Sequence, residues 1–331
     1  MAMDHWKRVE GALSGERLST PLCALWRHFP EDDQQAERLA ARTTQWQQRW
    51  DFDLVKFMPS GTYAVEDWGA TSSYRNAPNG AREVIAPGIR RIEDWARLHP
   101  LDTKVGSHGR QNQALALAAK ELKGQVPILQ TVFSPLTTAR KLAGERLFAD
   151  LRCAPELLAQ ALRVITDTTI GFALEALRCG AHGVFFATQL ASHRLLTHDE
   201  YVEFGRTYDL QVLNALRGLS RLNMLHVHGV DVMFDSLASY PVEMINWHDR
   251  LTEPSLRQAS ESFSGLLVGG LNEGQTMASG SSEAIEREVH DALAQCSHRR
   301  LMIAPGCVLH TETSDASIEA VLRAAASCAN R

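Results

Sequence analysis

The sequence lacks the features of several protein classes. Basic residues do not outnumber acidic ones: 34 Lys and Arg stand against 39 Asp and Glu, giving a net charge of −5. Nucleic-acid-binding proteins normally carry a surplus of basic residues, so we expect no nucleic acid as a partner. No uninterrupted apolar run reaches the roughly 18 residues of a membrane span, and the N-terminus lacks the apolar region of a signal peptide. We therefore predict a cytoplasmic protein that binds neither nucleic acid nor a membrane.

Paired cysteines, nucleotide motifs and repeats are missing as well. The six cysteines are scattered without a C-x-x-C pair, which indicates free thiols in a reducing compartment rather than disulfides. No G-x-G-x-x-G follows the first apolar run, so the usual dinucleotide-binding signature is absent. No segment recurs at a fixed period.

The sequence does have a regular alternation of short apolar runs and longer amphipathic stretches. The runs end at Gly, Pro or polar residues, as buried parallel strands do. They cover residues 21–29, 54–59, 126–133, 183–188, 223–229, 242–247, 265–271 and 301–308. Helices are predicted over Pro155–Cys179, from a capping box at Thr197, and over Ser282–Gln295 and Ser317–Ser327.

Eight strands that alternate with helices predict an α/β protein. A single (β/α)8 TIM barrel over residues 1–331 is favoured over the alternative, an open doubly wound sheet. Residues 60–108 are rich in Gly, Ser, Asn and Pro and form too long a stretch for a simple loop. We expect this excursion to cover the C-terminal mouth of the barrel, where catalytic groups of such barrels lie.

The residues at the predicted strand ends include a candidate metal site. His226 and His228 are two positions apart, so their side chains share one face of the fifth strand. Cys307 follows a glycine at the end of the eighth strand. Two imidazoles and one thiolate suit a tetrahedral Zn²⁺ ion with an open fourth position. The alternatives are two hydrogen-bonded histidines and an ordinary buried cysteine.

Further polar residues follow the strands. His248 and Asp249 are candidates for general acid–base catalysis, or for a surface histidine beside a helix-capping aspartate. Gly269 and Gly270 permit close approach of either a ligand or a neighbouring strand. Candidates for substrate binding, each of which also suits an ordinary loop contact, are Trp26, Arg27, His28, Tyr63, Gln189 and Trp247.

The strand-end motifs together resemble the uroporphyrinogen decarboxylase superfamily, over about residues 5–328. The matching segments are PLCALWRHF, VFSPLTTARKLAG, GAHGVFFATQ, LHVHG, INWHDR, LLVGGLNEG and APGCVLHTET. The resemblance implies a (β/α)8 barrel with its cleft at the carboxyl-terminal face.

That superfamily has two main branches. The decarboxylases need no metal and hold substrate carboxylates with an Arg-Gln-Ala-Gly-Arg segment, where this chain has residues 26–30, WRHFP, with one arginine. The other branch consists of zinc-dependent methyltransferases that move a methyl group between a corrinoid and a thiol. They carry His-x-Cys at the fifth strand and Cys at the eighth. This chain is similar at His226 and Cys307 but has His228 where that branch has Cys.

The resemblance therefore implies a zinc-dependent corrinoid:thiol methyltransferase with a small-molecule substrate, a corrinoid protein as candidate partner and a homodimer as candidate assembly. Replacing a thiolate ligand by His228 makes the zinc site one charge more positive, so an acceptor thiol ionises more readily but is held more tightly. Two alternatives remain open. One is a carboxy-lyase of tetrapyrrole biosynthesis, with Arg27 and His28 holding carboxylates. The other is a non-catalytic barrel that binds a tetrapyrrole or corrinoid.

Overall fold

Eight parallel strands form one sheet in the computed structural model, which describes residues 4–328. The strand order is β1-β10-β9-β8-β7-β6-β5-β2. The strands are β1 (Leu22–Cys23), β2 (Val55–Phe57), β5 (Ile128–Phe133), β6 (Gly183–Thr188), β7 (Met224–Val227), β8 (Met244–Trp247), β9 (Leu266–Leu271) and β10 (Leu301–Pro305). Each lies within a predicted apolar run, so the predicted strands are confirmed.

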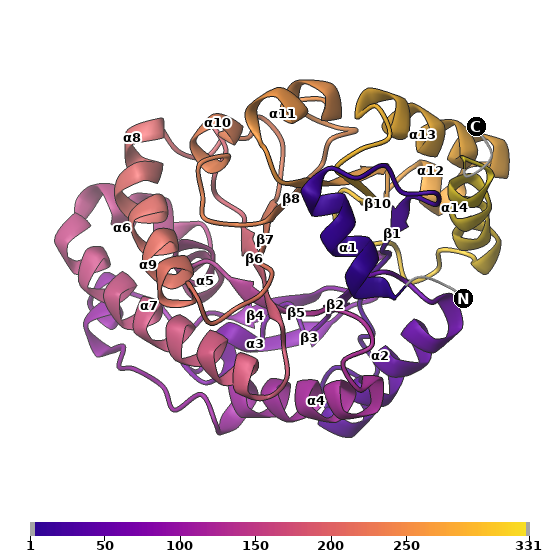
Figure 1. Cartoon of the computed structure of the whole chain (residues 1–331). Helices are drawn as coiled ribbons and strands as arrows, with labels where there is room; N and C mark the ends of the chain where they lie inside the picture. Colours follow the sequence, from indigo (N-terminus) through magenta and orange to yellow (C-terminus); the bar gives the residue numbers. More distant parts are fainter. Residues whose placement is uncertain (1–3, 329–331) are drawn as a thin grey trace.

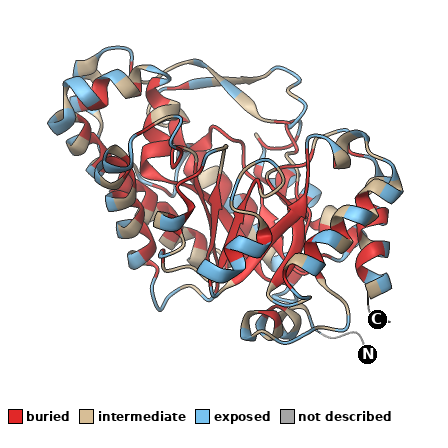
Figure 2. Cartoon of the chain, turned by 90° about the horizontal axis from the view of Figure 1, so that it is seen from above, coloured by how far each residue is buried: buried red, intermediate tan, exposed pale blue. Residues whose placement is uncertain are grey.

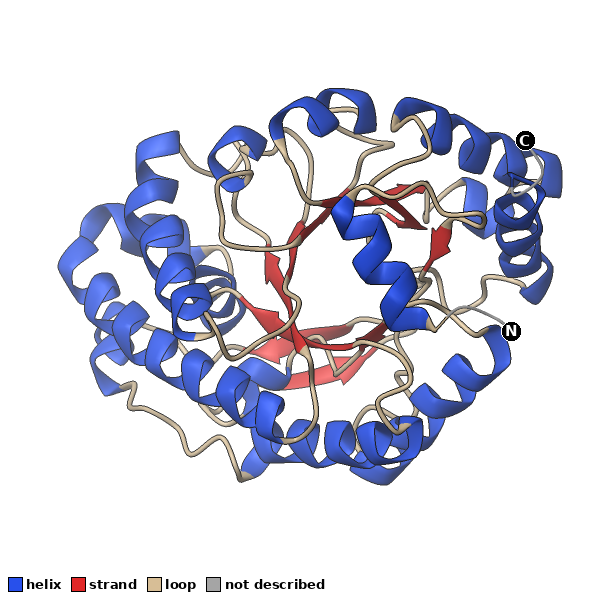
Figure 3. Cartoon of the chain, in the orientation of Figure 1, coloured by secondary structure: helices blue, strands red, loops and turns tan. Residues whose placement is uncertain are grey.

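The sheet curls until its two outer strands approach each other. The backbone N–H of Asp53 donates to the carbonyl of Cys23 at 2.9 Å, and the Asp53 carboxylate accepts from the backbone N–H of Cys23 at 2.9 Å. Helices surround the curled sheet (Figure 1, Figure 3). Buried residues gather in the strands and on the inward faces of the helices (Figure 2). The predicted TIM-barrel fold is confirmed.

The helices vary from one turn to nearly seven turns. They are α1 (His5–Ser14), α2 (Ala36–Trp50), α3 (Tyr63–Glu66), α4 (Gly106–Leu122), α5 (Pro135–Ala143), α6 (Arg146–Cys153), α7 (Pro155–Arg178), α8 (His198–Tyr201), α9 (Thr207–Ala215), α10 (Phe234–Leu237), α11 (Leu256–Ser262), α12 (Thr276–Ser279), α13 (Ser282–Gln295) and α14 (Asp315–Ser327). A 3-10 helix η1 (Ile92–Arg97) and a π-helical segment η2 (Val202–Arg206) complete the set. The predicted helices correspond to α7, to α8 with its Thr197 capping box, to α13 and to α14.

Helix α7 bears on the expectation that no helix spans a membrane. Although no uninterrupted apolar run occurs, this helix is long and apolar enough to cross a membrane by length and composition alone. In the fold, half of its most apolar window is buried, and the helix packs against α5, α9 and β5. Its apolar character therefore has an explanation in barrel packing.

The two ends of the barrel have different covers. Helix α1 lies across the amino ends of the strands, where the Trp6 indole N–H donates to the carbonyl of Gly124 and Arg8 pairs with Asp53. At the opposite end lies the excursion, which contains α3, η1 and an antiparallel hairpin of β3 (Thr71–Tyr74) and β4 (Arg82–Ala86). The carboxyl-terminal mouth is thus the end that the excursion partly covers.

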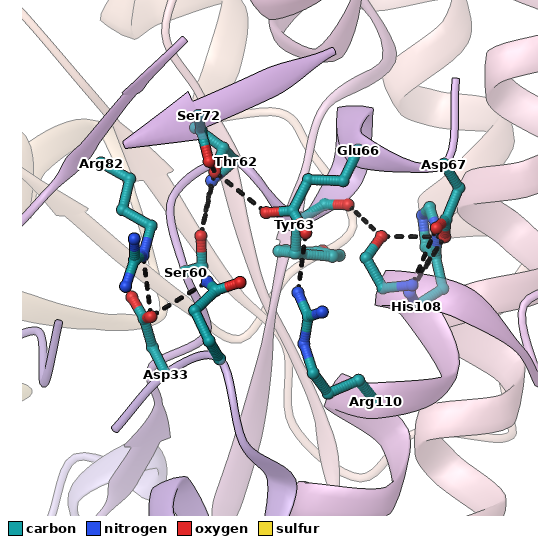
Figure 4. A network of polar contacts seen from close by, with 12 residues as sticks. Asp33, Ser60, Thr62, Tyr63, Glu66, Asp67, Ser72, Arg82, His108 and Arg110 are labelled. Atoms are coloured by element: carbon teal, nitrogen blue, oxygen red, sulfur yellow. Dashed lines mark hydrogen bonds and ion pairs between the residues drawn. The ribbon is translucent and has the colours of Figure 1, made fainter. Parts of the chain in front are cut away.

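A network of polar contacts holds the excursion to the barrel (Figure 4). On the hairpin, the Arg82 guanidinium donates to the Asp33 carboxylate at 2.8 Å and to the carbonyl of Pro30 at 2.7 Å. The Thr62 hydroxyl donates to Ser72 at 2.8 Å. These contacts anchor the tip of the hairpin above the mouth.

The start of α4 depends on one carboxylate. Asp67 accepts hydrogen bonds from the backbone N–H and hydroxyl of Ser107 and from the His108 ring, at 2.8 to 2.9 Å (Figure 4). A negative charge at a helix N-terminus satisfies free backbone N–H groups and interacts favourably with the helix dipole. Asp67 therefore connects α3 to α4.

We expect Asp67→Asn to lower the free energy of unfolding at pH 7 by about 2 kcal/mol, the usual size for losing hydrogen bonds to a charged group. Burial alone raises the pKa of Asp67, but the contacts with His108 and Ser107 outweigh it and hold the pKa well below its ordinary value. A depressed pKa stabilises the fold above the unfolded pKa near 4, and this contribution is lost at lower pH. Urea titrations should therefore show the difference from wild type narrowing as pH falls below about 4. Asp199→Asn, at a fully exposed side chain, is the control and should show no such difference.

Candidate metal centre

Four side chains converge at the carboxyl ends of the strands. The ligand atoms of His226, His228, His248 and Cys307 all lie within 4.8 Å of one another. The Cys307 Sγ atom is 3.8 Å from His226 Nε2 and 3.6 Å from His228 Nδ1. His248 Nε2 is 3.2 Å from His228 Nδ1. The structure brings the three proposed ligands together and adds His248 to them.

Asn246 determines which nitrogen of His226 faces the cluster. The Asn246 amide nitrogen donates to two backbone carbonyls, of Val268 and Pro305, at 2.8 and 3.1 Å. Its Oδ1 atom is therefore free to accept, and it lies 2.6 Å from His226 Nδ1. With the proton on Nδ1, the lone pair of His226 Nε2 points toward Cys307. Metal-bound histidines are commonly oriented by such a second hydrogen bond.

Glu273 forms an ion pair with His248. The Glu273 Oε1 atom lies 2.8 Å from His248 Nδ1, while Nε2 of the same ring faces the cluster. Glu273 and His248 are both buried. The carboxylate thus positions the ring, and His248 acts beside the two predicted histidines rather than with Asp249.

The cluster favours the anionic form of its thiol. Burial alone raises the pKa of Cys307, but contacts with the three imidazoles outweigh it and hold the pKa well below its usual value. Burial lowers the pKa of His248, but contacts with Cys307 and Glu273 raise it to about 10. At neutral pH a pKa of about 10 leaves His248 protonated beside the Cys307 thiolate. Zinc binds thiolate and neutral imidazole, so its binding would displace the His248 proton. His226, His228 and Cys307 therefore suit a tetrahedral Zn²⁺ ion, whose fourth position His248 or an acceptor would take.

A cavity of about 180 Å³ lies in front of the cluster. Six of the predicted site residues line it, including three of the cluster. They are Trp26, His28, Gln189, His226, His228 and Cys307. Residues Asn79, Ala81 and Arg82 of the hairpin line the same cavity, which places the excursion over the centre.

The other predicted site residues lie elsewhere. Tyr63 is buried in a separate pocket and donates to the carbonyl of Thr131. Trp247 donates to the carbonyl of Pro254 behind the sheet, and Arg27 donates to the carbonyl of Thr311 outside this cavity. Of the residues predicted to bind substrate, Arg27, Tyr63 and Trp247 therefore lie outside this cavity.

Asp249 is also directed away from the cluster. Its carboxylate accepts from the backbone N–H of Gly270 at 3.0 Å. A Cβ atom at Gly269 would lie 2.5 Å from the same oxygen. The close approach that these glycines permit is thus to Asp249, which has a structural contact rather than the acid–base position predicted for it.

Asn246 and Glu273 are the site residues that the sequence analysis missed. Both stand at predicted strand ends, as His226 and His248 do. Their position on the strands next to the histidines was a usable signal, since parallel strands bring their carboxyl ends together.

The family model of uroporphyrinogen decarboxylase (URO-D) matches residues 24–328. The chain belongs to this family. A methylcobamide:CoM methyltransferase MtbA of Methanosarcina acetivorans is 19% identical over 307 residues, which cover 90% of this chain and 86% of that protein. A methylcobamide:CoM methyltransferase MtaA of Methanosarcina barkeri is 23% identical over 214 residues, covering 64% of this chain and 61% of that one.

A solved structure supports the fold of this URO-D family member. It is described as a methyltransferase from Methanosarcina mazei and aligns with a TM-score of 0.81 at 20% sequence identity. The alignment covers 98% of this chain and 99% of that one. At this level of identity the likeness shows the shared barrel.

The geometry predicts one metal ion per chain that depends on the cluster. We expect elemental analysis to find close to one zinc per chain, and Cys307→Ser to lose it because a hydroxyl is a poor substitute for a thiolate ligand. Asn246→Leu should lower zinc affinity by about 10- to 100-fold, although Asn246 is not itself a ligand. Cys153→Ser, at an exposed cysteine, is the matched control. Unchanged zinc content in Cys307→Ser would rule out this site.

Proposed function

We propose that this chain is a zinc-dependent methyltransferase that moves a methyl group between a corrinoid and a metal-activated thiol acceptor. The observation that carries the proposal is the His226–His228–His248–Cys307 cluster facing a small cavity. The relatives named above are methylcobamide:CoM methyltransferases, which supports an enzyme of methyl transfer. A cytoplasmic location and a homodimer stay predictions from the sequence.

When bound, zinc would act as a Lewis acid that favours the anionic, nucleophilic form of an acceptor thiol. The chain's own residues prepare the site for it. Asn246 holds His226 in the tautomer with a free Nε2, and Glu273 orients His248. Neutral imidazoles and the Cys307 thiolate around a divalent ion would leave a net charge of +1, which attracts an anionic acceptor to the position that His248 would otherwise take.

The dimensions of the cavity suit the acceptor. Pockets that enclose drug-sized ligands measure roughly 300–1,000 Å³, whereas this cavity measures about 180 Å³. It accommodates a small thiol but does not enclose a tetrapyrrole. A corrinoid carried by a partner protein would therefore approach from the open side of the mouth, with its methyl group directed at the acceptor.

No specific observation favours the decarboxylase alternative. That reaction would need cations that hold the carboxylates of a tetrapyrrole, and Arg27 and His28 were the candidates. Burial lowers the pKa of His28 to about 3, so this residue is uncharged. The Arg27 guanidinium instead packs over the Trp46 ring, 4.5 Å from its centroid, and donates to a backbone carbonyl. It is therefore directed away from the cavity that holds the cluster.

We expect the purified protein to transfer the methyl group of methylcobalamin to a small thiol, and His226→Ala to lose this activity together with its zinc. His228→Cys should retain zinc, since thiolate is an equally good ligand. The added negative charge raises the pKa of the acceptor thiol and makes its anion more nucleophilic. The variant should therefore keep substantial activity, with the acidic limb of its pH profile moved to higher pH.

Two results would contradict this proposal. Wild-type protein with a full complement of zinc could fail to methylate any small thiol. Alternatively, His228→Cys could retain zinc but lose most of its rate, which would indicate that the metal polarises a substrate oxygen. Cys153→Ser serves again as the control for a change of cysteine number.

A further inference from the structure

One buried carboxyl group lies behind the barrel wall and takes no part in the candidate metal centre. Lys56 and Lys141 line the cavity of that centre, whereas Asp209 stands on α9 with none of its surface exposed. Its hydrogen-bond partners are the hydroxyls of Tyr201 and Tyr240, which are buried as well. Within the described part of the chain, no positive charge acts on this carboxyl group. Burying a charge without a cation is costly, so the surroundings favour the neutral acid.

Three oxygen atoms of these side chains form a closed ring. Asp209 Oδ2 lies 2.8 Å from the hydroxyl of Tyr201 and 3.0 Å from that of Tyr240, and the two hydroxyls are 3.1 Å apart. All three contacts have the length of a hydrogen bond, but an ionised carboxylate leaves only two protons for them. With the carboxyl group protonated, each oxygen donates one hydrogen bond and accepts one. Only the neutral form therefore satisfies all three contacts.

A π-helical segment aligns two members of the ring. α8, η2 and α9 follow one another without a break over residues 198–215. In a regular α-helix, residues eight positions apart, such as Tyr201 and Asp209, stand roughly 80° apart around the axis. The extra residue that a π-helical turn accommodates removes most of this angle. Gly205 lies in this segment, where a Cβ atom would be 2.4 Å from the Tyr201 ring. The irregular turn thus brings Tyr201 and Asp209 onto one face.

The ring joins the two connections on either side of β7. The first, from β6 to β7, contains Tyr201 and Asp209, and the second, from β7 to β8, contains Tyr240. Helices α8, α9 and α10 lie together on one side of the barrel (Figure 1). The Tyr201 hydroxyl also lies 3.5 Å from that of Thr188 at the end of β6, whose carbonyl accepts from the backbone N–H of His228. The ring therefore fastens the helical layer behind β7, where candidate metal ligands lie.

Tyr201 and Tyr240 are the titratable groups that face Asp209. Other charged groups on the surrounding helices have partners elsewhere or lie at the surface, as Glu200 does in its ion pair with Arg152. None of them acts on the pKa of Asp209. They include His198, Asp199 and Glu200 of α8, Glu203 and Arg206 of η2, Arg140 and Lys141 of α5, Arg163 and Asp167 of α7, and Asp235 of α10.

We propose that Asp209 is held as a neutral carboxylic acid in this ring, and that the ring is a pH-sensitive latch between the two connections that flank β7. When Asp209 loses its proton, the contact between Tyr201 and Tyr240 has no proton to share, and a buried negative charge has no cation beside it. The latch is closed at acidic pH and opens as pH rises. Burial raises the pKa of Asp209 to about 7, against the hydrogen bonds from both tyrosines, so the latch opens near neutral pH. It requires neither zinc nor methyl transfer.

The variant Asp209→Asn keeps a donor and an acceptor in the ring but cannot ionise. A raised carboxyl pKa stabilises the fold below the unfolded value near 4, and this contribution is lost as pH rises to about 7. We therefore expect Asp209→Asn to have nearly the melting temperature of wild type at about pH 5 and to exceed it by about 4 °C or more at about pH 8.5. Asp67→Asn, at an ionised aspartate, should show the opposite sign near neutral pH. Asp199→Asn, at a fully exposed side chain, is the control and should not differ from wild type.

Infrared spectroscopy tests the proton itself. We expect the carbonyl band of a protonated carboxylic acid in wild type at about pH 6, absent from Asp209→Asn, and its loss as pH rises to about 8.5. Because the hydrogen bond from Tyr240 lowers the pKa of Asp209, Tyr240→Phe should move the loss of this band to higher pH. Wild type and Tyr240→Phe provide this comparison even where Asp209→Asn fails to fold.

Hydrogen exchange measures the opening of the latch. At about pH 8.5, the amides of the segments 198–215 and 229–243 should exchange about ten-fold or more faster in wild type than in Asp209→Asn, and at about pH 5 equally fast. Equal exchange at both pH values would overturn the latch. A melting temperature of Asp209→Asn below that of wild type at both pH values, or a wild-type spectrum without the acid band at about pH 6, would overturn the neutral acid and the latch with it.

Discussion

The parallel register between β7 and β8 is the constraint on which the candidate metal centre depends. It pairs His226 with Asn246, so the candidate ligand and the residue that orients it stand side by side on the inner face of the barrel. The Asn246 amide then reaches carbonyls of Val268 and Pro305 on the next strands. The buried Asn246 side chain thereby links β8 to β9 and β10 and also determines the tautomer of His226. A slip of one residue would reverse the face of every side chain involved.

The same alternation explains how far the sequence could predict the site. Buried parallel strands read as continuous apolar runs, and this was enough to place all eight strands. It does not show which face of a run is the inner one. Once Asn246 is known to point inward, His248 shares its face, while Trp247 and Asp249 must point outward. His248 and Asp249 were predicted to share a site because they are adjacent, but only alternate residues of a strand share a face.

Other parts of the site depend on contacts between distant segments, which strand patterns do not encode. Tyr63 was assigned to the cleft because it follows the second strand, but α3 turns it into a pocket with Phe133 and Phe172. Lys56 stands inside an apolar run whose inner face was unknown. Lys141 lies on a helix and reaches the cavity only because α5 begins at the end of β5. Their common location becomes visible only in the folded barrel.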